Sequence, residues 1–441
     1  MQGRDNGPFA LRMKDVNLKS EEQVATGPVV LLADTNRWPV AARVAMGLAG
    51  VGCEVSGICP TPGHPLQKVS VVRRIFPYSG LRPLESLAAA IEATKPQIII
   101  PCDDRAVQHL HELHARAGQL EGATSSLAAL IERSLGPSES FRTVTSRHGL
   151  LTTARAEGIR IPATQPVTCI DDLRSWRERQ ALPWVLKADG TSGGRGVRIA
   201  QSVKQAEQFF LEMVRPYGLG RAVKRLCINR DPFWFRPWWK ETQSGVIVQE
   251  HIEGRPANCA VVCWEGKVLA GIGVEVVSAE GLTGPATVVR VVENREMTGA
   301  AERVARRLRL TGFFGLDFVV EETQRAAYLV EMNPRCTPLC HLQLGKGRDM
   351  VGALWAQLSN QRPPDIPPIT QNDVIAYFPQ AWNCQSEFLQ SSFQDVPRNE
   401  PELVQELLQP WPDRALVYRA FNHLHQMTSF AATSPMRKSS G

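Results

Sequence analysis

Three oxygen-bearing side chains in the second half of this 441-residue sequence could bind a hard metal ion. Asp317 lies in the apolar run 312–320, and Glu331 and Asn333 lie in the run 328–334 that follows a polar turn. Alternation in the predicted hairpin places Glu331 and Asn333 on one face, where Asp317 can join them from the partner strand. Two carboxylates and an amide oxygen suit Mg²⁺, whose coordination substrate phosphates usually complete. Solvent exposure or pairing with arginines is the alternative interpretation.

A second set of residues could bind phosphate. A loop rich in glycine and hydroxyl groups, 190–196, lies between apolar strands predicted at 183–188 and 197–199. Its backbone can close over an anion without interference from Cβ atoms. Lys187 enters the loop on the same strand face as Val185, so a cation lies beside an apolar surface. This arrangement suits a phosphate next to a flat base, although an ordinary glycine-rich hairpin has the same pattern.

The elements that position these residues begin with alternating strands and helices. The predicted strands span 29–34, 54–58 and 97–101, and the predicted helices span 40–50 and 83–94. This order predicts a right-handed parallel unit, in which ligands gather at the carboxyl ends of the strands, where Asp34, Asp103 and Asp104 fall. The chain contains neither GxGxxG nor GxxxxGK[ST], so we do not expect nucleotide phosphates to bind to this sheet. Further along, one helix is predicted at 143–158 and a strand at 245–252.

Together, the glycine loop with Lys187, the strand 245–252 and the hairpin 312–334 resemble the ATP-grasp superfamily, and most closely its carboxylate–amine ligases of unassigned substrate. The resemblance covers roughly residues 29–354. It implies an α/β and α+β architecture: an N-terminal Rossmann-like (pre-ATP-grasp) domain, an ATP-grasp domain with a lid subdomain, and a C-terminal extension.

The expected boundaries follow from this resemblance and from changes in composition. They are a disordered arm at 1–27, the Rossmann-like domain at 28–140, the ATP-grasp domain at 141–361 with its lid at about 160–247, and the C-terminal extension at 369–441. A proline-rich linker, 362–368, precedes the extension. In the extension we expect a strand at 373–378, helices near 400–408 and 415–427, and docking on the body of the protein through aromatic side chains.

The resemblance also implies roles for individual residues around the nucleotide. Lys187 contacts the α- and β-phosphates. A lid loop closes over them and includes Thr191, Ser192, Gly193, Gly194 and Gly196. The adenine edge meets backbone groups of Glu250 and Ile252, and the ring lies between Val185 and Val319.

Around the transferred phosphoryl group, the resemblance implies a metal site and two catalytic cations, Arg335 and Lys187. Asp317, Glu331 and Asn333 hold one or two Mg²⁺ ions, with Mn²⁺ as an alternative. Arg335 steadies the transferred phosphoryl group and the acyl phosphate.

The sequence departs from the family pattern at two places. Relatives usually carry an Asp-Lys pair twelve and eleven residues before a helix-ending glycine, where this chain has Ser146 and Arg147. Arginine keeps the charge and binds phosphate through a planar fork, so we expect Arg147 to contact the nucleotide. Many relatives have a ribose-binding glutamate near the position of Pro256, so the sequence does not identify the residue that contacts the ribose.

These features imply an ATP-dependent ligase that activates a carboxylate as an acyl phosphate and joins it to an amine, releasing ADP and phosphate. Two alternatives remain open. The enzyme could phosphorylate another oxygen acid, such as bicarbonate or an enol, before amination. A catalytically silent nucleotide-binding scaffold is the other alternative, for which Arg147 and Pro256 are the only hints in the sequence.

Composition limits the partners and the compartment. The net charge is only +6, and no apolar run approaches the ~18 residues that span a bilayer. Ten scattered cysteines without a CxxC pair predict reduced thiols, so we expect a cytoplasmic protein. We expect small-molecule carboxylate and amine substrates, with neither nucleic acid nor membrane as a partner. The aromatic and basic segment 221–240 favours a small packed insertion or a subunit interface, which allows a homodimer.

Two clusters that invite a metal interpretation have simpler explanations. His109, His111 and His114 lie on a predicted helix, on which only His111 and His114 share a face, so we expect a solvated helix face instead of a metal site. Cys336 and Cys340 adjoin the oxygen site, but thiolates are poor ligands for Mg²⁺, so we expect structural or substrate-lining thiols.

Overall fold

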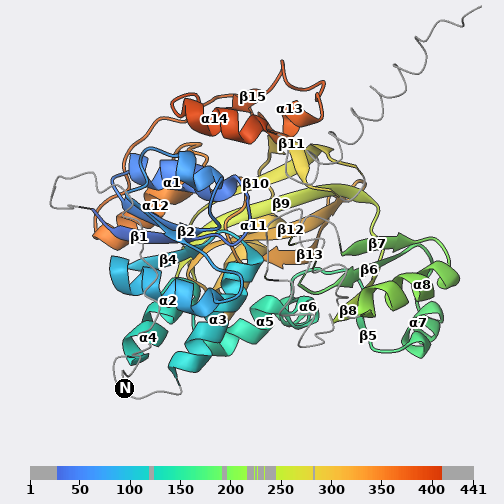
Figure 1. Ribbon diagram of the computed structural model, residues 1–441. Helices are drawn as coiled ribbons and strands as arrows, with labels where there is room; N and C mark the ends of the chain where they lie inside the picture. The colour runs from blue at the N-terminus through green and yellow to red at the C-terminus, as the bar shows by residue number, and fades with distance from the viewer. Residues whose placement is uncertain are drawn as a thin grey trace, which may run out of the picture.

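The described part of the chain contains three β-sheets, two with four strands and one with seven. A computed structural model describes residues 27–118, 124–190, 196–215, 223, 226, 233, 245–281 and 284–409. In Figure 1 the lid elements form a separate lobe, and the seven-stranded sheet lies between that lobe and the N-terminal domain. This arrangement matches the mixed α/β and α+β architecture expected from the sequence.

The N-terminal domain is a parallel sheet in the order β3-β2-β1-β4. Its strands are β1 (Val29–Ala33), β2 (Glu54–Cys59), β3 (Arg74–Pro77) and β4 (Ile98–Pro101), and its helices are α1 (Val40–Gly50), α2 (Pro83–Thr94), α3 (Asp104–Ala117) and α4 (Thr124–Leu135). The chain leaves β1 toward β2 on one side and returns to β4 on the other, so the carboxyl ends of β1 and β4 form a topological switch point. The expected strands and helices are present, and β3 is an additional edge strand.

The lid is an antiparallel sheet in the order β5-β8-β6-β7, with two helices packed on it. It comprises β5 (Thr164–Val167), α7 (Ile170–Arg177), β6 (Trp184–Ala188), β7 (Val197–Ala200), α8 (Val203–Val214) and β8 (Val246–Glu250). Trp184 and Leu186 of β6 are fully buried against the helices. Alternation therefore turns Val185 and Lys187 to the opposite face of the lid sheet.

The large sheet has the order β13-β12-β9-β10-β11-β14-β15. Its elements, with the helices beside them, are β9 (Gly254–Trp264), β10 (Lys267–Ala279), β11 (Ala286–Val291), α11 (Arg295–Leu308), β12 (Gly312–Glu321), β13 (Ala327–Asn333) and α12 (Met350–Ser359). One face packs on α11, whose apolar side is buried with Phe314, Leu316 and Phe318. The other face therefore bears Asp317 and meets the N-terminal domain.

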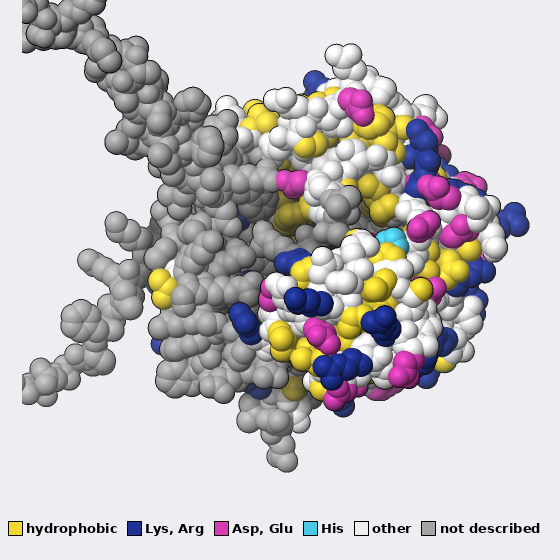
Figure 2. All heavy atoms as spheres, turned by 90° about the vertical axis from the view of Figure 1, so that its right-hand side faces the viewer, with side chains coloured by type: hydrophobic (Ala, Val, Ile, Leu, Met, Phe, Trp, Pro, Cys, Tyr) yellow, Lys and Arg dark blue, Asp and Glu magenta, His cyan; other side chains and the backbone are white. Residues whose placement is uncertain are grey.

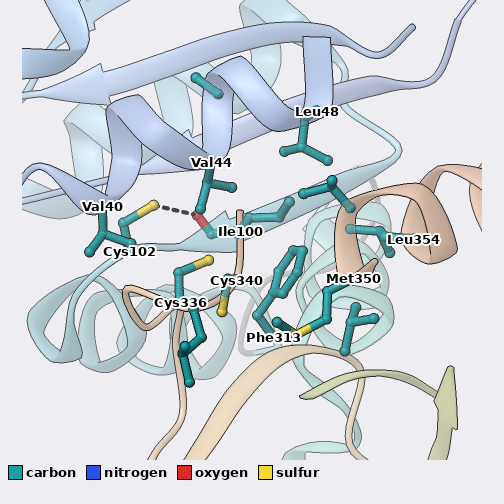
Figure 3. Packing of buried hydrophobic residues seen from close by; sticks show 14 of the residues in the cluster. Val40, Val44, Leu48, Ile100, Cys102, Phe313, Cys336, Cys340, Met350 and Leu354 are labelled. Atoms are coloured by element: carbon teal, nitrogen blue, oxygen red, sulfur yellow. Dashed lines mark hydrogen bonds between the residues drawn. The ribbon is translucent and has the colours of Figure 1, made fainter. Parts of the chain in front are cut away.

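Buried apolar side chains join the N-terminal domain to the large sheet. Val44 and Leu48 of α1 share one core with Phe313 of β12 and with Met350 and Leu354 of α12 (Figure 3). Cys102, Cys336 and Cys340 are fully buried at the edge of this core. Because burial of apolar surface stabilises contacts between elements, this core fixes the carboxyl edge of the N-terminal sheet next to β13.

The C-terminal extension adds strands to the large sheet. It contains β14 (Val374–Tyr377), α13 (Gln380–Asn383), β15 (Phe393–Asp395) and α14 (Pro401–Leu408). β14 pairs with β11, and β15 pairs with β14. Leu403 and Leu407 of α14 pack against Ala42 and Val69 of the N-terminal domain. The extension therefore ties two parts of the protein together, and the helix expected at 415–427 lies outside the described residues.

Two local expectations were wrong. The helix expected over 143–158 is two helices, α5 (Phe141–Thr145) and α6 (Arg147–Ala156), because Ser146 adopts an extended conformation and caps α6. The solvated environment expected for the histidines of α3 is not observed. His109 is buried with Nε2 2.9 Å from the Tyr78 hydroxyl, and the His111 ring stacks on Phe141. Tertiary packing has turned this side of α3 inward.

The described surface gives no sign of a single-charge patch on the lid side. Figure 2 shows acidic and basic side chains interspersed with apolar ones over the described part of this face. Among the described residues, no helix is long and apolar enough to cross a membrane. Nearly all of the aromatic and basic segment 221–240 lies outside the described residues.

Candidate active site

The β12–β13 hairpin brings the three candidate metal ligands together. Asp317 and Glu331 are direct cross-strand partners, and Asn333 Nδ2 donates to Asp317 Oδ2 at 2.8 Å. Asn258 of β9 donates to the other carboxylate oxygen of Asp317 at 2.5 Å. Desolvation at this site, followed by the negative charge of Glu331, raises the pKa of Asp317 above its ordinary value. Two adjacent carboxylates with an amide beside them are a donor set that a divalent cation would stabilise.

A β-bulge decides which residues of β13 face this site. Asp317 pairs with Glu331, but the next residue, Phe318, pairs with Leu329, so Val330 has no partner on β12. Strict alternation would place Leu329 on the same face as Glu331. The bulge instead lets Leu329 enter the core under α11, while Glu331 faces Arg147. It also frees the Val330 carbonyl from the ladder, and this carbonyl accepts a hydrogen bond from Lys187 Nζ at 3.2 Å.

Lys187 links the lid to this hairpin. Its side chain is buried on β6, and burial lowers its pKa to about 8, with Glu331 acting in the opposite direction and Arg147 adding to the decrease. At neutral pH the ammonium group is therefore still charged in a weakly hydrated place. A desolvated cation beside the candidate metal ligands Asp317, Glu331 and Asn333 is suited to bind phosphate oxygens.

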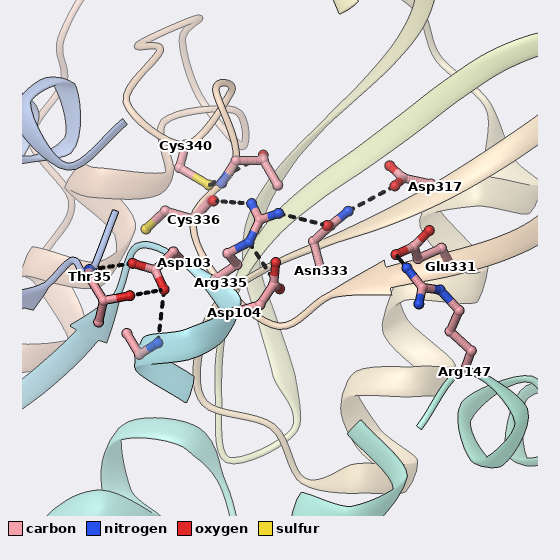
Figure 4. Close-up of polar contacts among 12 residues, drawn as sticks. Thr35, Asp103, Asp104, Arg147, Asp317, Glu331, Asn333, Arg335, Cys336 and Cys340 are labelled. Atoms are coloured by element: carbon pink, nitrogen blue, oxygen red, sulfur yellow. Dashed lines mark hydrogen bonds and ion pairs between the residues drawn. The ribbon is translucent and has the colours of Figure 1, made fainter. Parts of the chain in front are cut away.

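Arg147 is the second cation at the site, and it contacts Glu331. It is the first residue of α6, whose N-cap, Ser146, accepts a hydrogen bond from Gly149. Arg147 Nη2 lies 2.5 Å from Glu331 Oε1 (Figure 4). Its Nη1 donates to the Ala188 carbonyl. Asp189 lies 3.5 Å from Nη1. The departure from the family pattern thus places a cation directly on a candidate metal ligand.

Arg335 joins the hairpin to the N-terminal domain. Its guanidinium donates to Asn333 Oδ1 and to the Cys336 carbonyl, each at 3.1 Å, and its Nε lies 3.0 Å from Asp104 Oδ1. Although burial opposes its charge, Asp104 and other nearby acids raise the pKa of Arg335 above its ordinary value. Figure 4 shows the resulting series of polar contacts from Asp104 through Arg335 and Asn333 to Asp317.

The candidate nucleotide-binding residues lie on the lid and at the hinge. Glu250 ends β8, where its N–H donates to the Ala163 carbonyl and is therefore already occupied. Val185 on β6 is half-buried, as is Val319, which lies two residues after Asp317 on the same face of β12. Ile252 follows β8 and is half-buried. Gly196 accepts a hydrogen bond from Ala188, and the loop residues Thr191, Ser192, Gly193 and Gly194 lie outside the described residues.

Sequence reasoning missed two residues that contact this site. Asn258 interrupts an otherwise apolar stretch of β9, and that polar break was the available signal. Asp104 was placed at a ligand-binding edge of the N-terminal sheet, but its contact with Arg335 spans more than two hundred residues and depends on domain packing. Among the described residues, the hairpin included, no group of three or more His, Cys, Asp or Glu side chains could hold a metal, so the candidate set consists of two carboxylates with an amide beside them.

Comparison with known proteins identifies a domain and similar folds. Residues 153–338 match the family model of the ATP-grasp domain. The fold is similar to N5-carboxyaminoimidazole synthetase from Staphylococcus aureus complexed with ADP (TM-score 0.52, 13% identity, 79% of this chain and 82% of that chain). It is also similar to the biotin carboxylase domain of 2-oxoglutarate carboxylase from Hydrogenobacter thermophilus, complexed with MgADP (TM-score 0.53, 14% identity, 78% and 71% covered).

A third similar structure is N5-carboxyaminoimidazole ribonucleotide synthetase from Thermus thermophilus (TM-score 0.52, 14% identity, 77% and 80% covered). At these identities the likeness concerns the fold, and it confirms the fold expected from the sequence. The match to the family model identifies residues 153–338 as an ATP-grasp domain, which is the family that the sequence resembles.

Proposed function

We propose that this protein is an ATP- and Mg²⁺-dependent ligase that activates a carboxylate as an acyl phosphate and joins it to an amine. One observation supports this most directly: two cations lie beside the facing carboxylates Asp317 and Glu331, because Arg147 contacts Glu331 itself and Lys187 donates to the adjacent Val330 carbonyl. The ADP and MgADP in two similar structures support the use of the same nucleotide. The substrates are small molecules, and a homodimer stays a prediction.

The residues divide the work of phosphoryl transfer. Lys187 and Arg147 neutralise phosphate oxygens, and Val185 and Val319 enclose the base. Asp317, Glu331 and Asn333 would hold Mg²⁺, which supplies charge neutralisation for the phosphoryl oxygens. Phosphoryl transfer needs mostly positioning and charge neutralisation, so no nucleophilic side chain is required.

The reaction then proceeds in two displacements. A carboxylate oxygen of the acid attacks the γ-phosphorus of ATP, and the bond to ADP breaks. The amine nitrogen attacks the acyl carbon, and inorganic phosphate leaves with the electron pair. Arg335 lies next to Asn333 at 3.1 Å, where its charge can stabilise the acyl phosphate.

Hydroxylamine trapping tests this function without knowledge of the natural amine. The full chain is incubated with ATP, Mg²⁺, hydroxylamine and a panel of carboxylic acids, and ADP, AMP and hydroxamate are measured. We expect ADP, phosphate and a hydroxamate with particular acids only. AMP and pyrophosphate would exclude the acyl-phosphate mechanism, and ATP binding without ADP formation across the panel would favour a silent scaffold.

A further inference from the structure

The carboxyl edge of the N-terminal sheet bears three acidic residues, and two of them already interact with other residues of the protein. Asp34 is fully buried, with its Oδ2 3.3 Å from His64 Nε2. Asp103 caps α3 and accepts hydrogen bonds from Thr35 and from the Ala106 amide. Asp104 is different, because 34% of its side chain remains exposed. Among these three acids, Asp104 is the one available to a ligand at the switch point between β1 and β4.

The two carboxylate oxygens of Asp104 differ in their contacts. Its Oδ1 lies 3.0 Å from Arg335 Nε, while Oδ2 makes no hydrogen bond or ion pair with any residue that the structure describes. An ionised carboxylate can accept several hydrogen bonds, so one oxygen can hold Arg335 while the other binds a second cation.

The position of Asp104 relative to the candidate metal ligands Asp317, Glu331 and Asn333 indicates which kind of ligand it can bind. Arg335 lies between Asp104 and Asn333, and Asn333 contacts Asp317. Arg335 therefore separates Asp104 from the candidate metal ligands, and Asp104 lies on the side of that arginine that faces the N-terminal domain. A carboxylate there attracts a cation and can accept a proton, which are the two requirements of an aliphatic amine that is protonated at neutral pH.

We propose that Asp104 binds the amine substrate and that this substrate is an aliphatic primary amine, which arrives as its ammonium ion. This inference rests on the proposed ligase function and adds the class of acceptor to it. Asp104 takes one proton from the ammonium, and the freed nitrogen attacks the acyl carbon. The C–N bond forms as the bond from the acyl carbon to the phosphate oxygen breaks. Phosphate leaves with that electron pair, and the second nitrogen proton passes to solvent.

The alternative is that Asp104 only orients Arg335. Hydroxylamine separates the two roles, because it is largely uncharged at neutral pH and needs neither an anionic partner nor a strong base. A residue that acts through Arg335 affects the acyl phosphate itself, and so must affect hydroxamate and amide formation alike. A residue that binds the ammonium affects amide formation alone.

The test compares Asp104→Asn with the wild-type chain, using an acid that gives hydroxamate. The amine panel contains the common amino acids, methylamine, ethanolamine and putrescine, with aniline as an uncharged aromatic amine. We expect the KM for the aliphatic amine to rise about tenfold or more in Asp104→Asn. Hydroxamate formation should fall much less than amide formation, because the asparagine side-chain oxygen can still accept a hydrogen bond from Arg335 and hydroxylamine needs no anionic partner. Amide formation by the variant should also shift to higher pH, where free amine is present in solution.

Asp171→Asn is the matched control, because Asp171 is an exposed acid in the first turn of α7. Both variants should melt at similar temperatures, and the control should keep the wild-type KM. A parallel loss of hydroxamate and amide formation in Asp104→Asn would overturn the assignment, as would an enzyme that accepts aniline but no aliphatic amine. Absence of hydroxamate from the wild-type chain with every acid would instead refute the ligase function itself.

Discussion

The guanidinium of Arg147 lies 2.5 Å from Oε1 of Glu331, so a side chain of the protein holds a positive charge against a candidate metal ligand. Glu331 faces the carboxylate of Asp317 across the hairpin, and an uncompensated pair of like charges would destabilise the fold. Arg147 offsets this repulsion without a metal. For Glu331 to bind Mg²⁺, the arginine must move, and nucleotide phosphates nearby would give it another partner. Metal binding and nucleotide binding should therefore depend on each other.

This linkage predicts the behaviour of Arg147→Gln. Without the competing cation, Mn²⁺ should bind more tightly to the nucleotide-free variant than to wild type, because the two carboxylates are left without compensation. ATP binding should weaken at the same time, since one phosphate contact is lost. Electron paramagnetic resonance titration measures the first effect, and calorimetry measures the second. Arg155→Gln, at the exposed end of the same helix, is the control and should change neither. Unchanged Mn²⁺ binding in Arg147→Gln would contradict the inference that Arg147 and the metal ion compete for Glu331.

The two carboxylates of the hairpin should respond differently to neutralisation. Asp317 has a raised pKa, so its ionisation costs stability, and this cost is absent below its unfolded pKa and complete once the pH has risen through the folded value. Asp317→Asn should therefore leave the nucleotide-free melting temperature unchanged or raised at pH 7. Glu331→Gln removes the partner of Arg147 and should lower the nucleotide-free melting temperature slightly.

Both substitutions should nevertheless reduce turnover by about a hundredfold or more, because the metal loses an anionic ligand. Both should also remove the extra thermal stabilisation that Mg²⁺ adds to ATP. Differential scanning fluorimetry with and without Mg-ATP, combined with ADP release, measures all of these effects. Normal turnover by either variant would show that its carboxylate is structural.

Lys187 predicts how ATP binding depends on pH. Burial lowers the pKa of Lys187 to about 8, so the wild-type chain should bind ATP more weakly as the pH rises through 8 and the ammonium is lost. Lys187→Met should bind weakly at every pH between about 7 and 9, with no inflection near 8. In the nucleotide-free protein the folded pKa is below the unfolded one, so wild-type stability should increase relative to the variant above pH 8.

Calorimetric titration with ATP across this pH range checks the prediction, with circular dichroism to confirm folding. Lys204→Met changes an exposed lysine on α8 of the same lid, and it should retain the wild-type inflection. An inflection near pH 8 that persists in Lys187→Met would assign the titration to another group.

Patterns within single elements predicted much of this molecule. The hairpin of β12 and β13 follows from two apolar runs around a polar turn, and the pairing of Asp317 with Glu331 follows from its register. The strand and helix order of the N-terminal domain likewise placed Asp103 and Asp104 at a sheet edge. These predictions depend on local periodicity, which one sequence contains in full.

Features that depend on tertiary packing could not be read in this way. The bulge at Val330 adds an unpaired residue without any glycine or proline to mark it, and it decides the partner of Lys187. The inward turn of His109 results from packing against Tyr78, not from the pattern of α3. The contact of Arg147 with Glu331 joins residues 184 positions apart and needs the relative placement of lid, helix and sheet.

Asp395 should be important for the attachment of the C-terminal extension to the N-terminal domain. It is buried at the end of β15, where it pairs with Arg43 of α1 and lies 2.8 Å from His341 Nε2. Burial opposes ionisation, but the charges of His341 and Arg43 hold the pKa of Asp395 below its ordinary value. Its stabilising effect is therefore present above the unfolded pKa and is lost as the pH falls through the folded value.

Asp395→Asn should destabilise the protein by about 3 kcal/mol at pH 7, because the charge of Arg43 remains buried without its carboxylate. Urea unfolding measures this loss, and the difference from wild type should shrink as the pH is lowered below about 4, the ordinary pKa of aspartate in the unfolded chain, and vanish once the folded carboxylate is protonated at still lower pH. Asp373→Asn is the matched control, since Asp373 lies just before β14 with 63% of its side chain exposed, and it should change stability little. A loss of stability in Asp395→Asn that does not vary with pH would attribute the effect to packing, because an ionic contact must weaken when its carboxylate is protonated.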